Sequence, residues 1–414
     1  MANTMQATST PAPSRSHTAL WALTSLFFMW GFITALNDIL IPHLKALFDL
    51  SYTQAMLVQS CFFGAYFLVS VPAGKLVSTI GYQKGISIGL CTAAVGCILF
   101  IPSAIFIQYW MFLGALFVLA SGITLLQVAA NPLVTLMGDP KTASSRLTMT
   151  QAFNSLGTTI APIIGGILLF GAGEHMASDA DANAVKIPYL ALAAILVLLA
   201  VVMAKVPLPE NRTSSSANHT SHSSLSALKH RHLTLGVVGI FLYVGAEVAI
   251  GSFLVNYFGL TSIMGMSEGQ ASTYIAYYWG GAMVGRFIGA AVMQKVAAGK
   301  LLAFNAVASC SLILLSVMSS GSLAMWSILA VGFCNSIMFP TIFSLALKDL
   351  NNQTAQASGL LCLAIVGGAI IPLLQGVLAD IFGVQLSFLL PLLCYLFIGY
   401  YGLRGSTPQF SAAQ

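Results

Sequence analysis

The chain has 414 residues, of which 57% are hydrophobic and only 7% are charged, and its formal net charge is +5. A soluble globular domain carries about 25% charged residues, so the composition excludes a soluble protein, and the surface must face a lipid bilayer. The excess of positive charge is explained by membrane topology, and we expect no nucleic-acid partner.

Apolar runs of membrane-spanning length recur along the whole chain. The expected spans lie near residues 19–41, 55–80, 86–107, 109–137, 150–171, 187–206, 234–258, 270–294, 301–319, 323–348, 356–383 and 385–403. The pattern predicts an all-α membrane protein with twelve transmembrane helices.

A polar stretch divides these spans into six and six. The predicted organisation is a tail (1–18), an N-terminal six-helix half (19–206), a linker (207–233), a C-terminal six-helix half (234–403) and a tail (404–414). Lys and Arg concentrate in the tails, the linker and the loops on their side of the membrane. This asymmetry predicts that both termini are cytoplasmic.

The two halves repeat each other. Pro132 and Pro340 are 208 positions apart, and Gln127 and Asn335 each stand five residues before their proline. Such correspondence indicates two pseudo-symmetric halves that arose by duplication, as in many secondary transporters.

Two acidic residues stand inside apolar spans at nearly equivalent places in the halves, Asp38 and Glu247. A charge at the bilayer centre costs at least a few kcal/mol, so an intramembrane acid is by default a functional hypothesis. We expect both acids to handle a cation, with Asn37 beside Asp38. The basic residue Arg286, by contrast, is expected to be structural and to extend toward the cytoplasmic surface.

Amide and aromatic side chains lie in spans that the repeat relates to one another. Because amides and hydroxyls both donate and accept hydrogen bonds, they suit a neutral polyhydroxylated ligand, and a ring such as that of Trp279 suits the C–H face of a sugar. The alternative for each amide is a hydrogen bond that only joins helices. The candidate sugar-binding residues are Gln127, Asn131, Gln151, Asn154, Asn256, Tyr278, Trp279, Asn335 and Gln375.

Motifs of other function classes are missing from the sequence. There is no nucleotide-binding glycine loop and no metal-ligand spacing of His, Cys and carboxylates. We therefore expect neither an enzyme nor a protein with a resident cofactor. Uphill transport would have to draw on an ion gradient.

Several segments resemble one family closely: LNDILIPHLKALFDL (36–50), LQVAANPLVTLMG (126–138), GAEVAIGSFLV (245–255) and YYWGGAMVGRF (277–287). They are similar to the fucose permeases of the major facilitator superfamily, and most to the bacterial glucose/galactose transporter branch. The resemblance implies the major facilitator fold and cation-coupled monosaccharide uptake by alternating access about a central polar cavity. It also implies a bacterial inner-membrane protein, which we expect to be monomeric, with Asp38 essential to coupling.

The chain departs from the proton-coupled fucose permeases at one position, where Gln127 replaces a Glu. An amide carries no proton, and the glucose/galactose branch, with which sodium coupling is associated, has this Gln. Sodium, with Asp38 and Asn37 among its oxygen ligands, is therefore favoured over a proton carried by Asp38 or Glu247. Other readings are uptake of N-acetylglucosamine or fucose, a non-transporting sugar sensor, and a drug/proton antiporter.

Overall fold

The computed structural model describes the backbone of residues 13–48, 52–106, 108–170, 186–206 and 224–408. Side chains within these ranges are described except at residues 13–17, 36–48, 52–56, 59–60, 104, 163, 165–170, 186–188 and 224–225. Most of the predicted linker and tails therefore lies outside the described residues, and so do the side chains of Asn37 and Asp38.

The N-terminal half consists of six long helices. They are α1 (Pro13–Phe48), α2 (Tyr52–Ile80), α3 (Tyr82–Phe106), α4 (Tyr109–Leu136), α5 (Ala143–Phe170) and α6 (Lys186–Lys205), with a 3₁₀ turn η1 (Pro140–Thr142) before α5.

The C-terminal half begins with three continuous helices and ends with three spans built from pieces. The continuous helices are α7 (Arg231–Gly259), α8 (Glu268–Val292) and α9 (Ala298–Met318). The remaining spans are α10 (Gly321–Asn335) with α11 (Met338–Ala346), α12 (Thr354–Leu363) with η5 (Ala364–Val366) and α13 (Gly367–Phe382), and α14 (Val384–Ser387) with α15 (Leu389–Tyr400) and the π-helical turn η6 (Tyr401–Gly405). The short turns η3 (Ser224–Lys229) and η4 (Asn351–Gln353) precede α7 and α12.

The described residues thus form twelve helical units and no strand. Nine of the units are long and apolar enough, within the described residues, to cross a membrane. The other three are α5, α6 and α8; α6 offers a shorter apolar stretch, and α8 is more polar than the rest. Helices with polar faces can span a bilayer when those faces pack on other helices.

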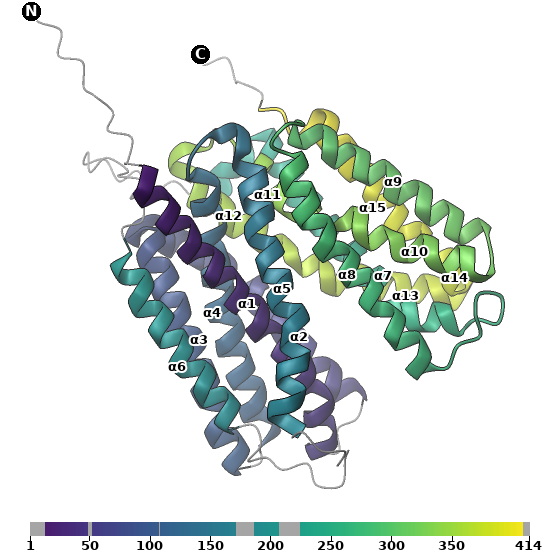
Figure 1. The fold of residues 1–414 in the computed structure, drawn as a ribbon, viewed down its shortest axis with the longest axis horizontal. Helices are drawn as coiled ribbons and strands as arrows, with labels where there is room; N and C mark the ends of the chain where they lie inside the picture. The colour runs from purple at the N-terminus through teal and green to yellow at the C-terminus, as the bar shows by residue number, and fades with distance from the viewer. Residues whose placement is uncertain (1–12, 49–51, 107, 171–185, 207–223, 409–414) are drawn as a thin grey trace, which may run out of the picture.

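The two halves form two bundles that meet at one end and diverge toward the other (Figure 1). They meet where α5 packs on α8 and α11, and where α2 packs on α12. The first turns of α1 and the last turn of η6 lie on this same side of the molecule (Figure 1). We call this side the closed end.

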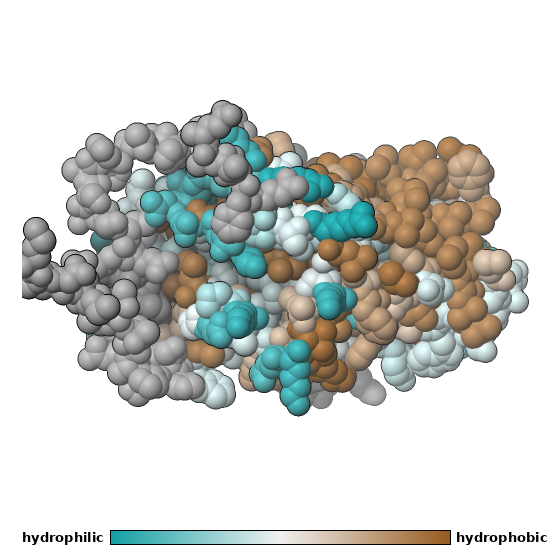
Figure 2. Space-filling view, turned by 90° about the horizontal axis from the view of Figure 1, so that it is seen from above, coloured by the Kyte–Doolittle hydropathy of each residue, from teal (hydrophilic) through white to brown (hydrophobic). Residues whose placement is uncertain are grey.

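Polar and basic residues gather at the closed end. Figure 2 looks onto it and shows hydrophilic surface over its middle, with apolar surface over the outer helices of the C-terminal half. The described basic residues at helix ends and loops on this side are Lys75, Lys84, Lys141, Arg146, Lys205, Lys229, Arg231, Lys295, Lys300, Lys348 and Arg404.

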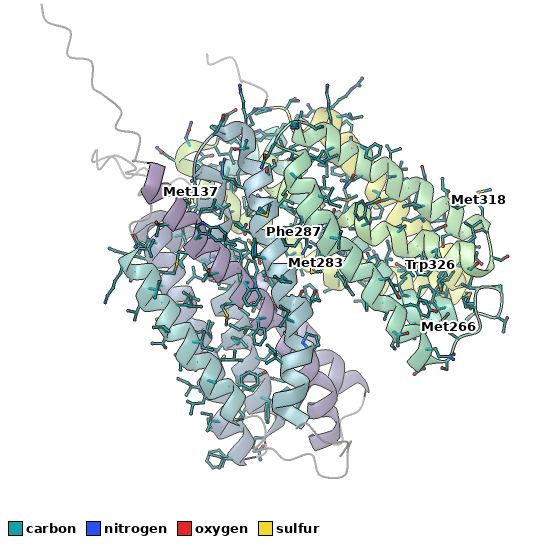
Figure 3. The ribbon with its side chains drawn as sticks, in the orientation of Figure 1. Met137, Met266, Met283, Phe287, Met318 and Trp326 are labelled. Atoms are coloured by element: carbon teal, nitrogen blue, oxygen red, sulfur yellow. The ribbon has the colours of Figure 1, made fainter. Side chains whose placement is uncertain are left out.

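At the far end of the C-terminal half, an aromatic cluster faces outward. The rings of Tyr274 and Trp326 are 6.2 Å apart and those of Tyr277 and Trp326 are 5.5 Å apart, centre to centre. Tyr277 and Trp326 are about half exposed. Trp326 lies there together with Met266 and Met318 (Figure 3).

Glycines set how closely α1 and α5 approach. A Cβ added at Gly31 would collide with the backbone carbonyl of Asn154, and one added at Gly157 would collide with the carbonyl of Phe28. The two backbones therefore touch at this crossing, where any larger residue would push them apart. Because α1 also carries Asp38, the crossing fixes the direction in which that part of the helix leaves the bundle.

Candidate functional site

In the N-terminal half, α4 carries two buried amides one turn apart. The Oε1 atom of Gln127 accepts a hydrogen bond of 2.8 Å from the Tyr66 hydroxyl of α2. Asn131 is fully buried, and neither its Oδ1 nor its Nδ2 atom has a hydrogen-bond partner among the described residues. An unpaired buried polar atom costs about 1–3 kcal/mol, so a partner for the Asn131 amide would be stabilising.

The neighbouring helix α5 carries two further amides. Gln151 is buried, and its Nε2 atom has no partner within the described part of the chain. Asn154 donates through Nδ2 to the Phe27 carbonyl of α1 at 2.9 Å. Asn154 therefore ties α5 to α1, and it does so about three helical turns before Asp38 along α1.

In the C-terminal half, the corresponding amide belongs to a closed hydrogen-bond network. Asn335, at the end of α10, donates through Nδ2 to the Tyr278 hydroxyl at 2.8 Å, and its Oδ1 accepts from the Tyr395 hydroxyl at 2.7 Å. The Tyr243 hydroxyl donates to the Asn335 carbonyl at 3.1 Å. All four residues are fully buried. Asn335 and Tyr278, both predicted to bind sugar, thus bind each other here.

Glu247 lies beside this network. Its backbone carbonyl accepts from the Tyr278 hydroxyl at 3.2 Å. Its carboxyl group interacts with the Arg286 guanidinium and the Tyr243 hydroxyl, while its Oε1 atom is buried without a partner among the described residues. The acid therefore lies within electrostatic range of a cationic side chain, and one of its oxygens has no partner among the described residues.

Trp279 lies on α8, and its ring is close to Gly251 of α7. One and two turns further along α8, Met283 and Phe287 lie in the seam between the halves (Figure 3). The Trp279 ring packs edge-on against Tyr278, with centroids 5.1 Å apart, and remains 45% exposed.

The other two predicted sugar-binding residues lie apart from these groups. Asn256 is exposed on α7. Gln375 of α13 is fully buried and donates through Nε2 to the Ser387 hydroxyl of α14 at 3.3 Å. Gln375 therefore joins helices within the C-terminal half.

Arg286 was expected to be structural and to extend toward the cytoplasmic surface; its side chain instead ends inside the protein, at the contact between the two halves. Its guanidinium donates to the Ser336 carbonyl and to the Ser155 hydroxyl of α5, in the other half. The sequence holds one signal for this role: Arg286 lies farther from the ends of its predicted span than any other basic residue, and glycines stand close before it.

The side chains of Asn37 and Asp38, predicted to bind the cation, lie outside the described residues. Within the described residues, no three His, Cys, Asp or Glu side chains cluster as a metal site would require.

The comparisons with known proteins agree with this architecture. Residues 22–365 match the model of the Major Facilitator Superfamily. The chain belongs to this superfamily. It is accordingly a multi-pass membrane transporter with the predicted twelve-helix, two-half fold, and it is not an enzyme.

Individual relatives are similar over nearly the whole chain. The sequence is 56% identical to a glucose/galactose transporter of Brucella abortus over 97% of this chain and 99% of the relative. It is 35% identical to the L-fucose-proton symporter of Escherichia coli over 93% of this chain and 92% of the relative. A crystal structure of the superfamily transporter FucP in the outward conformation matches with a TM-score of 0.89 and 32% identity, covering 95% of this chain and all of that one.

Proposed function

We propose that this sugar transporter imports a neutral monosaccharide of the glucose/galactose type, by symport with a cation, across a bacterial inner membrane. The names of its relatives support a sugar as substrate. The observation that carries the proposal is Asn131, a fully buried amide whose two hydrogen-bonding atoms have no partner among the described residues. A sugar hydroxyl can donate to one of these atoms and accept from the other.

The orientation follows from the basic residues at the closed end. Lys and Arg concentrate on the cytoplasmic side of membrane proteins, so the closed end, with the start of α1 and the end of η6, faces the cytoplasm. The halves diverge toward the outside, and the structure is outward-facing. Its similarity to a transporter crystallised in the outward conformation supports this assignment.

Sugar binding is proposed to use the two halves differently. In the N-terminal half, Asn131 and Gln151 supply unpaired donors and acceptors for the hydroxyls. In the C-terminal half, the exposed ring of Trp279 supplies an apolar face for the sugar ring. The Asn335 network holds α8 in place behind Trp279. Alternating access then requires the halves to rock about the bound sugar, which a single chain containing both halves can do as a monomer.

Coupling is proposed to depend on Asp38, with Asn37 and Glu247 in supporting roles. A carboxylate that carries no cation is costly to enclose in the membrane, whereas a neutralised one is not. Cation binding therefore permits the loaded transporter to close. Because Gln127 carries no proton, we favour sodium over a proton, with Asp38 as one sodium ligand.

Counterflow of radiolabelled hexose in proteoliposomes tests this function. We expect galactose and glucose to exchange, and concentrative uptake to require an inward sodium gradient and to persist when the proton gradient is collapsed. A panel of competing sugars that includes fucose and N-acetylglucosamine identifies the substrate. Uptake that follows the proton gradient and ignores sodium would reject sodium coupling; absence of any exchange would indicate a non-transporting sensor.

A substitution at Asn131 links the observation to the function. Asn131→Leu removes the unpaired amide, and we expect hexose affinity to fall about fivefold to a hundredfold. Asn305→Leu is the matched control, because the Asn305 amide already donates to the Cys334 carbonyl at 2.9 Å within the C-terminal half. If the Asn131 variant and the wild type bind hexose with equal affinity, Asn131 does not contact the sugar.

A further inference from the structure

The two prolines related by the repeat each free a backbone carbonyl. Proline has no N–H group, so the carbonyl four residues earlier loses its helical donor. Pro132 frees the carbonyl of Val128 inside α4. Pro340, in the first turn of α11, leaves the carbonyl of Ser336, between α10 and α11, without an N–H donor four residues on. These two carbonyls are 208 positions apart, as are the prolines. A buried carbonyl must find another donor.

In the N-terminal half the donor comes from the opposite half. The hydroxyl of Ser358, on α12, donates to the Val128 carbonyl at 2.8 Å, and Ser358 is fully buried. This hydrogen bond joins the two halves at the closed end. Because Pro132 offers no N–H group to the Val128 carbonyl, the Ser358 hydroxyl takes the place of the missing helical donor.

In the C-terminal half the donor is Arg286. Its Nε atom donates to the Ser336 carbonyl at 3.2 Å, and the same guanidinium donates to the Ser155 hydroxyl of α5 in the opposite half. Gly285 makes this approach possible, because a Cβ there would come within 2.6 Å of the Ser336 hydroxyl oxygen. The freed carbonyl thus anchors a cation that reaches across to the other half.

We infer that Ser358 and Arg286 are positioning residues that hold the cytoplasmic ends of the two halves together in the outward-facing state. Each forms a latch. In the first, the bond that opens is the one from the Ser358 hydroxyl to the Val128 carbonyl itself. In the second, Arg286 is anchored on the Ser336 carbonyl of its own half, and its bond to Ser155 is the part that opens. The role of these latches in transport rests on the proposed alternating access. The contacts themselves form without sugar, so they can be tested separately.

The guanidinium is suited to a contact that must open repeatedly. It has five N–H donors in a fixed plane, so it can release Ser155 while it keeps the Ser336 carbonyl and the charge interaction with Glu247. The cation therefore stays neutralised inside the membrane when the halves separate. Lysine, with one nitrogen, cannot hold all three partners in this arrangement.

Cys362 provides a native reporter for the Arg286 latch. It is fully buried on α12, at the seam with α2, and close enough to interact with Tyr66. Opening of the closed end exposes it to a small thiol reagent. The experiment follows alkylation by N-ethylmaleimide in proteoliposomes without sugar, resolved by mass spectrometry for each cysteine. Cys97 and Cys394, buried inside the N-terminal and C-terminal halves, serve as internal controls.

For Arg286→Gln and for Ser155→Ala we expect the alkylation rate of Cys362 to rise about fivefold. Loss of one hydrogen bond changes the equilibrium between the closed and open forms by about this factor. The rates at Cys97 and Cys394 should not change. The double variant should show no more than the larger single effect, because both substitutions break one contact. Lys295→Gln, which removes an exposed charge near the same end, should leave the rate unchanged.

The Ser358 latch needs a reporter at the other seam, because Ser358 interacts with Cys362 directly. Ser144 is buried and its hydroxyl lies 2.5 Å from that of Ser344 of α11. In a Ser144→Cys background, Ser358→Ala should raise alkylation of the introduced thiol about fivefold. An unchanged rate in each of these variants would overturn the inference, and so would an equal rise at Cys97 and Cys394, which would indicate general loosening.

Discussion

The two halves place the same repeated amide in opposite situations. Gln127 and Asn335 each stand five residues before their proline, and each is hydrogen-bonded by a tyrosine. Both side-chain amide atoms of Asn335 are paired with tyrosine hydroxyls, whereas those of Asn131, one turn beyond Gln127, have no partner among the described residues. The repeated position is thus followed by an unpaired amide in one half and is part of a hydrogen-bonded network in the other, and we propose sugar binding for the first and a structural role for the second.

The largest expected effect separates the two acids of the halves. Asp38→Asn should abolish concentrative uptake while sugar exchange continues, because the charge that binds the cation is lost and the sugar-binding amides remain. Glu247→Gln should retain partial accumulation, since its carboxyl group is already balanced by Arg286. The accumulation ratio under an ion gradient, compared with equilibrium exchange, measures both. Normal accumulation by the Asp38 variant would remove this residue from coupling.

A crossed pair of substitutions tests the asymmetry of the amides. Asn131→Leu should weaken sugar binding and leave stability unchanged or higher, because an unpaired buried polar group is replaced by an apolar one. Asn335→Leu should lower stability by about 1–3 kcal/mol, because the hydroxyls of Tyr278 and Tyr395 lose their partner. Calorimetric binding and thermal unfolding in detergent report the two quantities. The comparison fails if both variants lose affinity without loss of stability.

Gln127→Glu sharpens the question of the ion. A carboxyl at this buried position adds a titratable group, whose protonation state changes with pH. The hexose uptake of the variant, measured at fixed sodium, should therefore vary more steeply between about pH 5 and pH 8 than that of the wild type. The wild type, which we expect to follow sodium, is the reference at each pH. Equal pH profiles would show that position 127 takes no part in coupling.

The smallest expected effect concerns the Trp279 ring. A Cβ at Gly251 would come within 3.1 Å of the ring atom Cζ2, so Gly251→Ala should displace the indole. We expect hexose affinity to fall about two- to tenfold, because an aromatic contact is worth about 0.5–1.5 kcal/mol. Gly280→Ala, beside Trp279 but facing open space, is the control. Equal affinities in the two variants would place the sugar away from this ring.

The sequence was sufficient to predict the fold, because span length and apolar composition are set by the bilayer and need no tertiary information. The sequence does not, however, predict whether a proline interrupts the helix in which it lies. Pro132 lies inside the continuous α4, while α10 ends before Pro340. The outcome depends on which donors neighbouring helices bring to the freed carbonyl, and no local pattern contains that.

The candidate site was predictable in its residue types but not in their partners. Asn131 and Asn335 look alike in sequence, yet only the arrangement of tyrosines on other helices pairs one and leaves the other unpaired. The direction of the Arg286 side chain was not predictable for the same reason. Its place near a helix end suggested that it reaches the nearest membrane surface, but one of its hydrogen-bond partners, Ser155, belongs to the other half.

The aromatic cluster at the far end of the C-terminal half has a consequence for the lipid. Tyr277 and Trp326, half exposed at the outer end of the bundle, are residues that prefer the headgroup region. We expect them to hold the outer end of that half at one depth, so that tilting of the half during transport would stretch or compress the surrounding bilayer. Mismatch costs fractions of a kcal/mol per Å. The length of the lipid acyl chains should therefore shift the balance between outward-facing and inward-facing transporters. The transport rate should then depend on the thickness of the bilayer.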